Sequence, residues 1–324
     1  MELFEEYKSL VEQRIASLNF GIEPRQLYQP ISYTLAGGGK RLRPVLALAA
    51  CDLFEGNVQD AIDAAIGIEI FHNFTLLHDD IMDQSHLRRG KETVYKKWNT
   101  NIAILSGDTM FALAYQLILK APKTMLCPVL ETFTQTAIEV CEGQQFDMDF
   151  EDRDDVSIPE YIDMIRLKTA VLIGASLKTG ALVANAGILQ ANLLYDFGVN
   201  AGIAFQLKDD YLDAFGNTET FGKRIGGDIV ANKKTYLYLK CLELADEKDK
   251  IRLHDLFRQK QADGAAKVKQ VLDLYDRYKI KDETTTEMEH FFGKALEIIN
   301  QVDASSNKKK LLADYARWLF EREY

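Results

Sequence analysis

Apolar residues recur at intervals of three and four positions along most of the chain, which is the pattern of helices with a buried face. In the first segment, for example, Leu3, Tyr7 and Leu10 lie on one helical face that continues to Leu18. No segment shows a convincing alternation of apolar and polar residues between turn signals, which would indicate β-strands. The pattern therefore predicts an all-α protein.

Glycine, proline and polar turns divide this pattern into separate helices. After the first, the predicted helices cover residues 25–36, 44–54, 58–83, 101–120, 125–150, 159–185 and 191–215, followed by four or five shorter ones from 228 to the end. No linker rich in Pro, Gly or Ser interrupts the chain, and we find no internal repeat. We therefore expect one domain, residues 1–324, whose central helices are apolar almost all round.

The composition is that of a folded globular protein and agrees with a helical chain. Of the 324 residues, 47% are hydrophobic and 27% are charged. The chain has 6 prolines, about 2% of its residues against a usual value of about 5%, and proline disrupts helix interiors. The formal net charge of −10 argues against a general nucleic-acid-binding protein.

The cysteines and the N-terminal segment indicate the cellular compartment in which the protein is expected. The four cysteines form no CxxC pair, so neither a zinc site nor a disulfide framework is indicated. The N-terminal segment is acidic and lacks the basic and apolar regions of a signal peptide. The longest weakly polar stretch, 170–189, carries Lys178 and Asn185 and is typical of a buried helix. We expect a cytoplasmic protein without a transmembrane segment.

Two clusters of aspartates stand at the C-terminal ends of predicted apolar helices. Residues i and i+4 share one face of a helix, so the first cluster places Asp79 and Asp83 side by side. Like charges at this spacing repel each other unless a cation lies between them. Mg²⁺ prefers oxygen ligands and is usually held by one or two carboxylates plus substrate phosphates, so two such clusters favour magnesium. The clusters consist of Asp79, Asp80 and Asp83, and of Asp209, Asp210 and Asp213.

Basic residues next to glycine lie near both clusters, whereas the acidic segment 151–155 is interpreted as a solvated connection. Three glycines at 37–39 precede Lys40, Arg41 and Arg43 at a predicted helix start. Glycine permits close approach of a ligand to the backbone, and a helix N-terminus supplies unpaired N–H groups. Further bases follow each aspartate cluster, at 88–91 and at 222–234. These segments predict a site for more than one diphosphate, held by magnesium and by basic side chains.

Taken in order, these motifs resemble those of the trans-prenyltransferases, the head-to-tail polyprenyl diphosphate synthases, of the short-chain type. The resemblance covers nearly the whole chain. It implies the isoprenoid synthase fold, an orthogonal helical bundle around a deep central cavity with the two aspartate motifs facing each other across its mouth. It also implies a homodimer. The shared segments are GGGKRLRP at 37–44, FHNFTLLHDDIMD at 71–83, LRRG at 87–90, GQQFD at 143–147, Lys168-Thr169, FQLKDDYLD at 205–213, and GKRIGGDI at 222–229 with Lys233 and Thr235.

The implied reaction condenses isopentenyl diphosphate with an allylic diphosphate (dimethylallyl, geranyl or farnesyl) and releases pyrophosphate. The allylic C–O bond would ionise, the isopentenyl double bond would attack the cation, and a proton would then pass to the pyrophosphate. Three Mg²⁺ ions are implied. Asp79 and Asp83 would hold two of them and Asp209 the third, with Asp80, Asp210 and Asp213 in supporting positions.

The resemblance also implies roles for individual residues. Those expected to bind isopentenyl diphosphate are Lys40, Arg43, His72 and Arg89. Those expected to bind the allylic diphosphate are Arg88, Lys168, Lys223 and Lys233. Lys168, Thr169 and Gln206 are expected to act in catalysis, the last two because their oxygens would lie near the cation. Gln144 and Asp147 are interpreted as structural or supporting residues.

Product length is expected to depend on residues before the first motif. Phe74 and Phe71 precede Asp79 by five and eight positions, or about 7.5 and 12 Å along a helix. The ring of Phe74 could therefore form the floor of the cavity. In the family, an aromatic residue here with a small residue such as Thr75 after it suits short products, farnesyl or geranylgeranyl diphosphate.

Three other interpretations account for the motifs in part. A terpene cyclase also uses an aspartate motif and magnesium but needs no isopentenyl site. A di-iron carboxylate protein would use Glu69 with His72 and Glu287 with His290, and it leaves the glycine-flanked bases unexplained. A non-catalytic regulatory subunit would be expected to have degraded aspartate motifs, and both motifs are intact.

Overall fold

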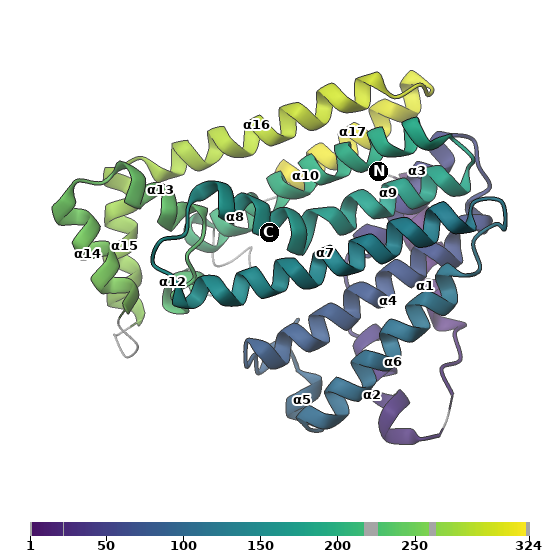
Figure 1. Cartoon of the computed structure of the whole chain (residues 1–324), viewed down its shortest axis with the longest axis horizontal. Coiled ribbons are helices and arrows are strands. Elements are labelled where there is room, and N and C mark those ends of the chain that lie inside the picture. The colour runs from purple at the N-terminus through teal and green to yellow at the C-terminus, as the bar shows by residue number, and fades with distance from the viewer. Residues whose placement is uncertain (1, 22, 217–225, 259–263, 322–324) are drawn as a thin grey trace. The chain divides into compact units, whose positions relative to one another are not determined.

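Helices form nearly all of the regular structure in the computed structural model, which describes residues 2–21, 23–216, 226–258 and 264–321 (Figure 1). The predicted all-α class is confirmed. The first helices are α1 (Glu2–Ala16), α2 (Arg25–Leu35), α3 (Leu42–Leu53), α4 (Val58–Met82), α5 (Val94–Lys97), α6 (Thr100–Ile118) and α7 (Leu126–Asp152). They are followed by α8 (Ile158–Ile165), η1 (Arg166–Ala170), α9 (Val171–Val183) and α10 (Ile188–Phe215).

The C-terminal third is divided into more helices than the sequence predicts. Instead of four or five short helices, the described residues form six, and α16 alone spans 22 residues. They are α12 (Gly227–Val230), α13 (Tyr236–Leu244), α14 (Glu247–Arg258), α15 (Gly264–Arg277), α16 (Ile280–Gln301) and α17 (Ser306–Glu321). Among the described residues, no helix is both long and apolar enough to cross a membrane.

The chain divides into two compact units. Unit 1 comprises Met1–Gln135, Ala175–Tyr195 and Asp303–Ser305, and unit 2 comprises Thr136–Gly174, Asp196–Val302 and Ser306–Tyr324. The first aspartate motif and the glycine turn at 37–39 belong to unit 1. The second aspartate motif and the Lys168-Thr169 pair belong to unit 2.

In unit 1, the long helix α4 packs against α3 and α6 and ends in the first aspartate motif. Its start is fixed by Asn57, whose side chain accepts a hydrogen bond from the N–H of Gln59. Close contact with α6 depends on Gly67, because a Cβ there would lie 2.9 Å from the carbonyl oxygen of Ala114. Helix packing therefore determines where α4 presents its C-terminal carboxylates.

In unit 2, α8 begins at a capping box in which Ser157 and Glu160 bond reciprocally. The sequence predicts one helix over 159–185, and the structure is helical from Ile158 to Val183, but a π-helical turn, η1, separates α8 from α9. The turn packs against glycine on two helices of the same unit. A Cβ on Gly143 of α7 would lie 2.3 Å from the N atom of Lys168, and one on Gly202 of α10 would lie 2.8 Å from the Cα of Ala170. Such turns are common at functional sites.

A short hairpin follows the first aspartate motif, where the sequence predicts no strand. β1 (Leu87–Arg88) pairs antiparallel with β2 (Lys91–Glu92). The two residues that connect them, Arg89 and Gly90, have φ values of 53° and 74°, the left-handed conformation of a type I′ turn. The hairpin therefore presents two consecutive arginines, Arg88 at the end of β1 and Arg89 in the turn.

Candidate active site

The first aspartate motif in unit 1 is paired with an arginine of the hairpin. Asp79 and Asp80 lie in the last turn of α4, and Asp83 is its exposed C-cap residue. The Arg88 guanidinium donates through Nε to Asp80 Oδ1 at 2.7 Å and through Nη2 to Asp79 Oδ2 at 3.1 Å. Burial raises the pKa of Asp80, while the adjacent Arg88 opposes that shift. Arg88 thus links two carboxylates of this motif.

The available side-chain ligands fit a magnesium ion that is also bound by substrate and water better than a metal held by protein ligands alone. In the part of the chain that the structure describes, no three or more His, Cys, Asp or Glu side chains gather around one point. Mg²⁺ is usually completed by water and substrate phosphates instead of by protein ligands alone. The carboxylates at the end of α4, and separately those on α10, suit such an ion when a diphosphate supplies the remaining ligands.

The glycine turn and the hairpin, two segments far apart in the sequence, meet in unit 1. The Arg89 guanidinium donates a hydrogen bond to the carbonyl oxygen of Gly38. A Cβ on Gly39, whose φ is 145°, would lie 3.0 Å from Arg89 Nη1. Glycine is therefore required here both for the backbone angle and for the approach of the guanidinium. The structure brings together these two predicted basic segments, with Lys40 next to the turn.

Arg41, one of the three bases after the glycine turn, is surrounded by oxygen acceptors in the core. Arg41 is only 3% exposed and bonds to Glu69 at 3.0 Å, to Glu12 at 2.8 Å and to the carbonyl oxygen of Leu35 at 2.6 Å. It therefore joins α1, α2 and α4 to the start of α3. This pairing also commits Glu69 to Arg41 and Asn73, which removes the basis of the di-iron interpretation.

Arg43 and His72 lie in an electropositive environment. Burial, and then the charge of Arg89, lower the pKa of Arg43 to about 10, against an opposing effect of Glu69. Among the described residues, the buried Nε of Arg43 has no hydrogen-bond partner. Burial lowers the pKa of His72 well below its usual value, with further contributions from Arg43 and Arg89. Positive groups that disfavour one another's charge in this way favour a bound polyanion.

The second aspartate motif lies near the C-terminal end of α10 in unit 2. Asp213 Oδ2 accepts a hydrogen bond from the N–H of Asp228 at 2.9 Å, and its carbonyl oxygen accepts one from Gly226 at 2.7 Å. A Cβ on Gly227 would lie 3.0 Å from Asp213 Oδ1. The glycines of the 226–227 segment therefore let the chain return to this carboxylate. The predicted ligand Lys223 lies outside the described residues.

Asp210 stands at the centre of a chain of hydrogen bonds. Tyr161 Oη donates to Asp210 Oδ2 at 2.5 Å, and Gln206 Nε2 donates to Asp210 Oδ1 at 3.2 Å. Thr169 Oγ1 donates to Gln206 Oε1 at 3.1 Å. Burial and the nearby Asp228 raise the pKa of Asp210 well above its usual range, against the effect of these donors. The predicted pair Thr169 and Gln206 is thus in direct contact.

Lys168 is held by the GQQFD segment of α7. Its Nζ contacts Asp147 Oδ2 at 2.5 Å, and both side chains are about three-quarters buried. Gly143, one turn earlier on α7, is the residue that allows η1 to approach. The GQQFD segment therefore positions the predicted catalytic lysine, a role that its glycine and aspartate spacing alone does not reveal.

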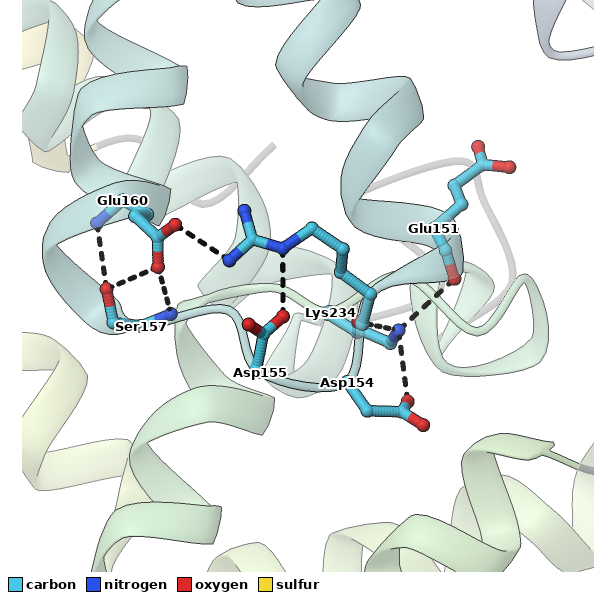
Figure 2. A network of polar contacts seen from close by, with 7 residues as sticks. Glu151, Asp154, Asp155, Ser157, Glu160 and Lys234 are labelled. Atoms are coloured by element: carbon cyan, nitrogen blue, oxygen red, sulfur yellow. Dashed lines mark hydrogen bonds and ion pairs between the residues drawn. The ribbon is translucent and has the colours of Figure 1, made fainter.

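The acidic segment 151–155 is solvated but fixed in place (Figure 2). Lys234 Nζ donates to the carbonyl oxygen of Glu151 at 3.2 Å and to that of Arg153, and it lies 3.3 Å from Asp154 Oδ1. Arg153 pairs with Asp155 and Glu160, both at 2.8 Å. The half-buried Lys233, a predicted allylic ligand, is the residue immediately before Lys234.

The residues predicted to set product length belong to an aromatic cluster in unit 1. Phe74 and Thr75 are half-buried, whereas Phe71 is fully buried beneath Phe74, Phe111 and Phe133. Sequence reasoning missed Phe111 of α6, because only the packing of α6 on α4 brings it to Phe74. It also missed Tyr161, whose partner Asp210 is 49 positions away.

A comparison with known proteins identifies the class. The polyprenyl synthetase family profile matches residues 24–275. The chain therefore belongs to the polyprenyl synthetase family and is an all-α prenyltransferase with the isoprenoid synthase fold.

The similarity extends to particular members. A short chain isoprenyl diphosphate synthase from Methanothermobacter thermautotrophicus is 34% identical over 325 residues, covering 100% of this chain and 99% of that protein. A geranylgeranyl diphosphate synthase from Sulfolobus acidocaldarius is 39% identical, covering 94% of this chain and 92% of that protein. The crystal structure of a geranylgeranyl pyrophosphate synthase matches with a TM-score of 0.95 and 44% identity over 99% of each chain.

Proposed function

We propose that this enzyme condenses isopentenyl diphosphate with an allylic diphosphate to give a short all-trans prenyl diphosphate and pyrophosphate. The observation that carries the proposal is the charge arrangement in unit 1. There Arg88 links Asp79 and Asp80, while burial and neighbouring arginines lower the pKa values of Arg43 and His72. Such a set of groups suits a diphosphate accompanied by a cation.

In this proposal, the basic residues of unit 1 divide between the two substrates. Arg43, Arg89 and His72, with Lys40, bind isopentenyl diphosphate. Arg88 binds the allylic diphosphate, because it already lies at the carboxylates that would meet the accompanying ions. The uncharged form of His72 would donate or accept a hydrogen bond without adding to the positive charge.

Residues of unit 2 would act on the reacting end of the allylic substrate. Lys168, Lys233 and Lys223 bind its diphosphate, and Asp147 orients Lys168. When the allylic C–O bond ionises, the hydroxyl oxygen of Thr169 and the amide oxygen of Gln206 stabilise the cation electrostatically. Attack by the isopentenyl double bond and loss of a proton to pyrophosphate complete the reaction without a side-chain base.

The family is generally magnesium-dependent, and three ions are proposed here. Asp79, Asp83 and Asp209 would hold them, supported by Asp80, Asp210 and Asp213. Bound magnesium would polarise the diphosphate and neutralise the charge of the leaving group. The i, i+4 spacing of the outer carboxylates on α4 and α10 supports this assignment.

We further propose geranylgeranyl or farnesyl diphosphate as the product, a homodimer as the assembly and the cytoplasm as the location. The half-buried Phe74 supports a short product, since a ring there would stop the growing tail. The exposed Ile104 and Leu105 of α6 offer apolar surface for a second copy. All four cysteines are unpaired, as is usual in a reducing compartment.

The test is incubation of the purified chain with Mg²⁺, isopentenyl diphosphate and each of dimethylallyl, geranyl and farnesyl diphosphate, with chromatography of the products. Elongated prenyl diphosphates are expected from at least one starter. A cyclic hydrocarbon formed without consumption of isopentenyl diphosphate would indicate a cyclase instead. Light scattering of the same sample measures the oligomeric state.

A further inference from the structure

In unit 2, hydrogen bonds between four side chains connect the helical segment α8–η1 to helix α10 at two positions. Tyr161 and Thr169 belong to the continuous piece formed by α8 and η1, and they are eight residues apart. Gln206 and Asp210 lie one turn apart on α10. Tyr161 bonds to Asp210, Asp210 to Gln206 and Gln206 to Thr169, at 2.5, 3.2 and 3.1 Å. The connection is therefore continuous from a buried tyrosine to a proposed cation-stabilising hydroxyl.

The chain of bonds determines which way the Gln206 amide faces. Gln206 Nε2 donates to Asp210 Oδ1, so the NH₂ end of the amide faces Asp210. The amide oxygen must then face Thr169, and because it can only accept, the threonine hydroxyl must donate to it. This arrangement leaves the Thr169 oxygen with its lone pairs directed away from Gln206, free to face positive charge. A reversed amide would turn that hydroxyl around.

The buried end of this series of hydrogen bonds, Tyr161 and Asp210, is suited to orienting the Gln206 amide. Tyr161 is 4% exposed and Asp210 is 5% exposed. Each oxygen of Asp210 has its own donor, Tyr161 on one and Gln206 on the other. Tyr161 lies in the first turns of α8, whose start is fixed by the capping box of Ser157 and Glu160. The hydroxyl of Tyr161 is thus held by structure that has no contact with substrate in the proposed function.

We propose that Tyr161 and Asp210 are positioning residues, which act through the Gln206 amide to direct the lone pairs of Thr169 toward the allylic cation. This inference rests on the proposed function, since it assumes that a cation forms next to Thr169. It assigns Asp210 a purpose that differs from direct ligation of an ion. Tyr161 has no counterpart among the residues that the sequence motifs single out.

The first experiment compares Tyr161→Phe with Tyr238→Phe in the full-length enzyme. Both remove a buried hydroxyl from unit 2, but that of Tyr238 bonds to His254 at 3.0 Å and is outside the chain of bonds. Tyr161→Phe is expected to lower kcat about tenfold, the effect of losing one hydrogen bond in the transition state. The KM for isopentenyl diphosphate and the Mg²⁺ dependence should stay unchanged. Wild-type kcat in Tyr161→Phe would overturn the proposal.

A double-mutant cycle separates orientation from a general structural effect. If Tyr161 acts through Thr169, then Tyr161→Phe should change kcat less than twofold in a Thr169→Val background, because the group it directs is already gone. Equal fold losses in the two backgrounds would show that the residues are independent and would overturn the proposal. Thermal melting of each variant measures folding, so that kcat is compared among folded proteins only.

Substitutions at Asp210 supply a second test in case Tyr161→Phe does not fold. Asp210→Asn keeps an oxygen that can accept from Gln206, so it should lower kcat less than Asp210→Ala does, and the loss in either variant should shrink in a Thr169→Val background. A large rise in the Mg²⁺ needed by Asp210→Asn would show a ligand role and overturn the proposal. Failure of the wild-type chain to make any prenyl diphosphate would instead refute the proposed function, so the two failures are distinguishable.

Discussion

The rings of Phe74 and Phe111 are nearly parallel, 13° apart, with their centroids separated by 5.2 Å. Phe74 lies on α4, about 7.5 Å before Asp79 along the helix axis, and Phe111 lies on α6. Offset stacked rings stabilise each other beyond their burial. Helix α6 therefore supports the ring that α4 presents below the first aspartate motif.

We expect Phe74→Ala to lengthen the main product by at least one isoprene unit, because it removes the ring proposed to stop the tail. Phe111→Ala should shift products in the same direction but less, since Phe74 then loses only its support. Chromatography of dephosphorylated products measures both effects. Phe257→Ala, which removes a buried ring of unit 2, is the control and should leave product length unchanged. Identical products from Phe74→Ala and wild type would show that Phe74 is not the stop.

Condensation should require Mg²⁺ and both aspartate motifs. Asp79→Ala and Asp209→Ala are each expected to abolish turnover, because each removes a carboxylate proposed to bind magnesium. Asp79→Ala should melt no lower than the metal-free wild type, since it relieves repulsion and Arg88 keeps its bond to Asp80. Product formation across a Mg²⁺ titration, with and without EDTA, checks this. Full activity in excess EDTA would contradict the metal assignment.

The two diphosphates should respond to different arginines. Arg43→Ala is expected to raise the KM for isopentenyl diphosphate, and Arg88→Ala that for the allylic substrate. Loss of a charge-assisted hydrogen bond costs about 1.5–3 kcal/mol, or roughly ten- to a hundredfold in affinity. Lys40→Ala should follow Arg43→Ala. Arg14→Ala, which removes an arginine paired with Asp63 in the same unit, is the control. Equal shifts for both substrates in every variant would contradict a two-site assignment.

Lys234→Met should destabilise unit 2 more than an ordinary surface substitution. The Lys234 side chain is 10% exposed and satisfies carbonyl groups at the end of α7 (Figure 2). We expect the free energy of unfolding to fall by about 1–3 kcal/mol. Lys250→Met removes a lysine paired with the exposed Glu247 one turn away on the same helix and should cost less than about 1 kcal/mol. Urea denaturation of both variants measures the difference. Equal losses of unfolding free energy would show that Lys234 stabilises the protein no more than an ordinary surface lysine does.

Long helices and the aspartate motifs were predictable from the sequence because their signals are local. The apolar repeat predicts a helix over 58–83, and α4 covers Val58–Met82. The π-helical turn was not predictable, since it interrupts a continuous apolar pattern and packs against Gly143 and Gly202, which lie on other helices. Local periodicity contains no information about such contacts.

The candidate site shows the same division. Spacing predicts carboxylates for magnesium and bases for diphosphate, but it does not show which base pairs with carboxylates in the core. Arg41 does so because Glu12 and Glu69 meet it in the core, whereas the neighbouring Arg43 stays without a carboxylate partner among the described residues. That distinction arises from tertiary packing of α1 and α4 around the start of α3.

Because of His72, the free energy of unfolding should fall more steeply with decreasing pH in the wild-type enzyme than in a variant without this histidine. Burial and the adjacent arginines hold its pKa well below 6.5, the value expected in the unfolded chain. Below about pH 6.5 the unfolded state therefore binds a proton that the folded state does not. The stability that comes from keeping His72 uncharged is thus fully present above that pH and is lost as the pH falls. One such group lowers the free energy of unfolding by up to about 1.4 kcal/mol per pH unit. Replacing His72 by Gln should remove that slope from the wild-type curve between pH 6 and 5 (roughly the range fixed by the unfolded pKa). Urea denaturation of both proteins at each pH measures the slope, and parallel curves for His72→Gln and wild type would show that His72 takes up its proton in the folded enzyme.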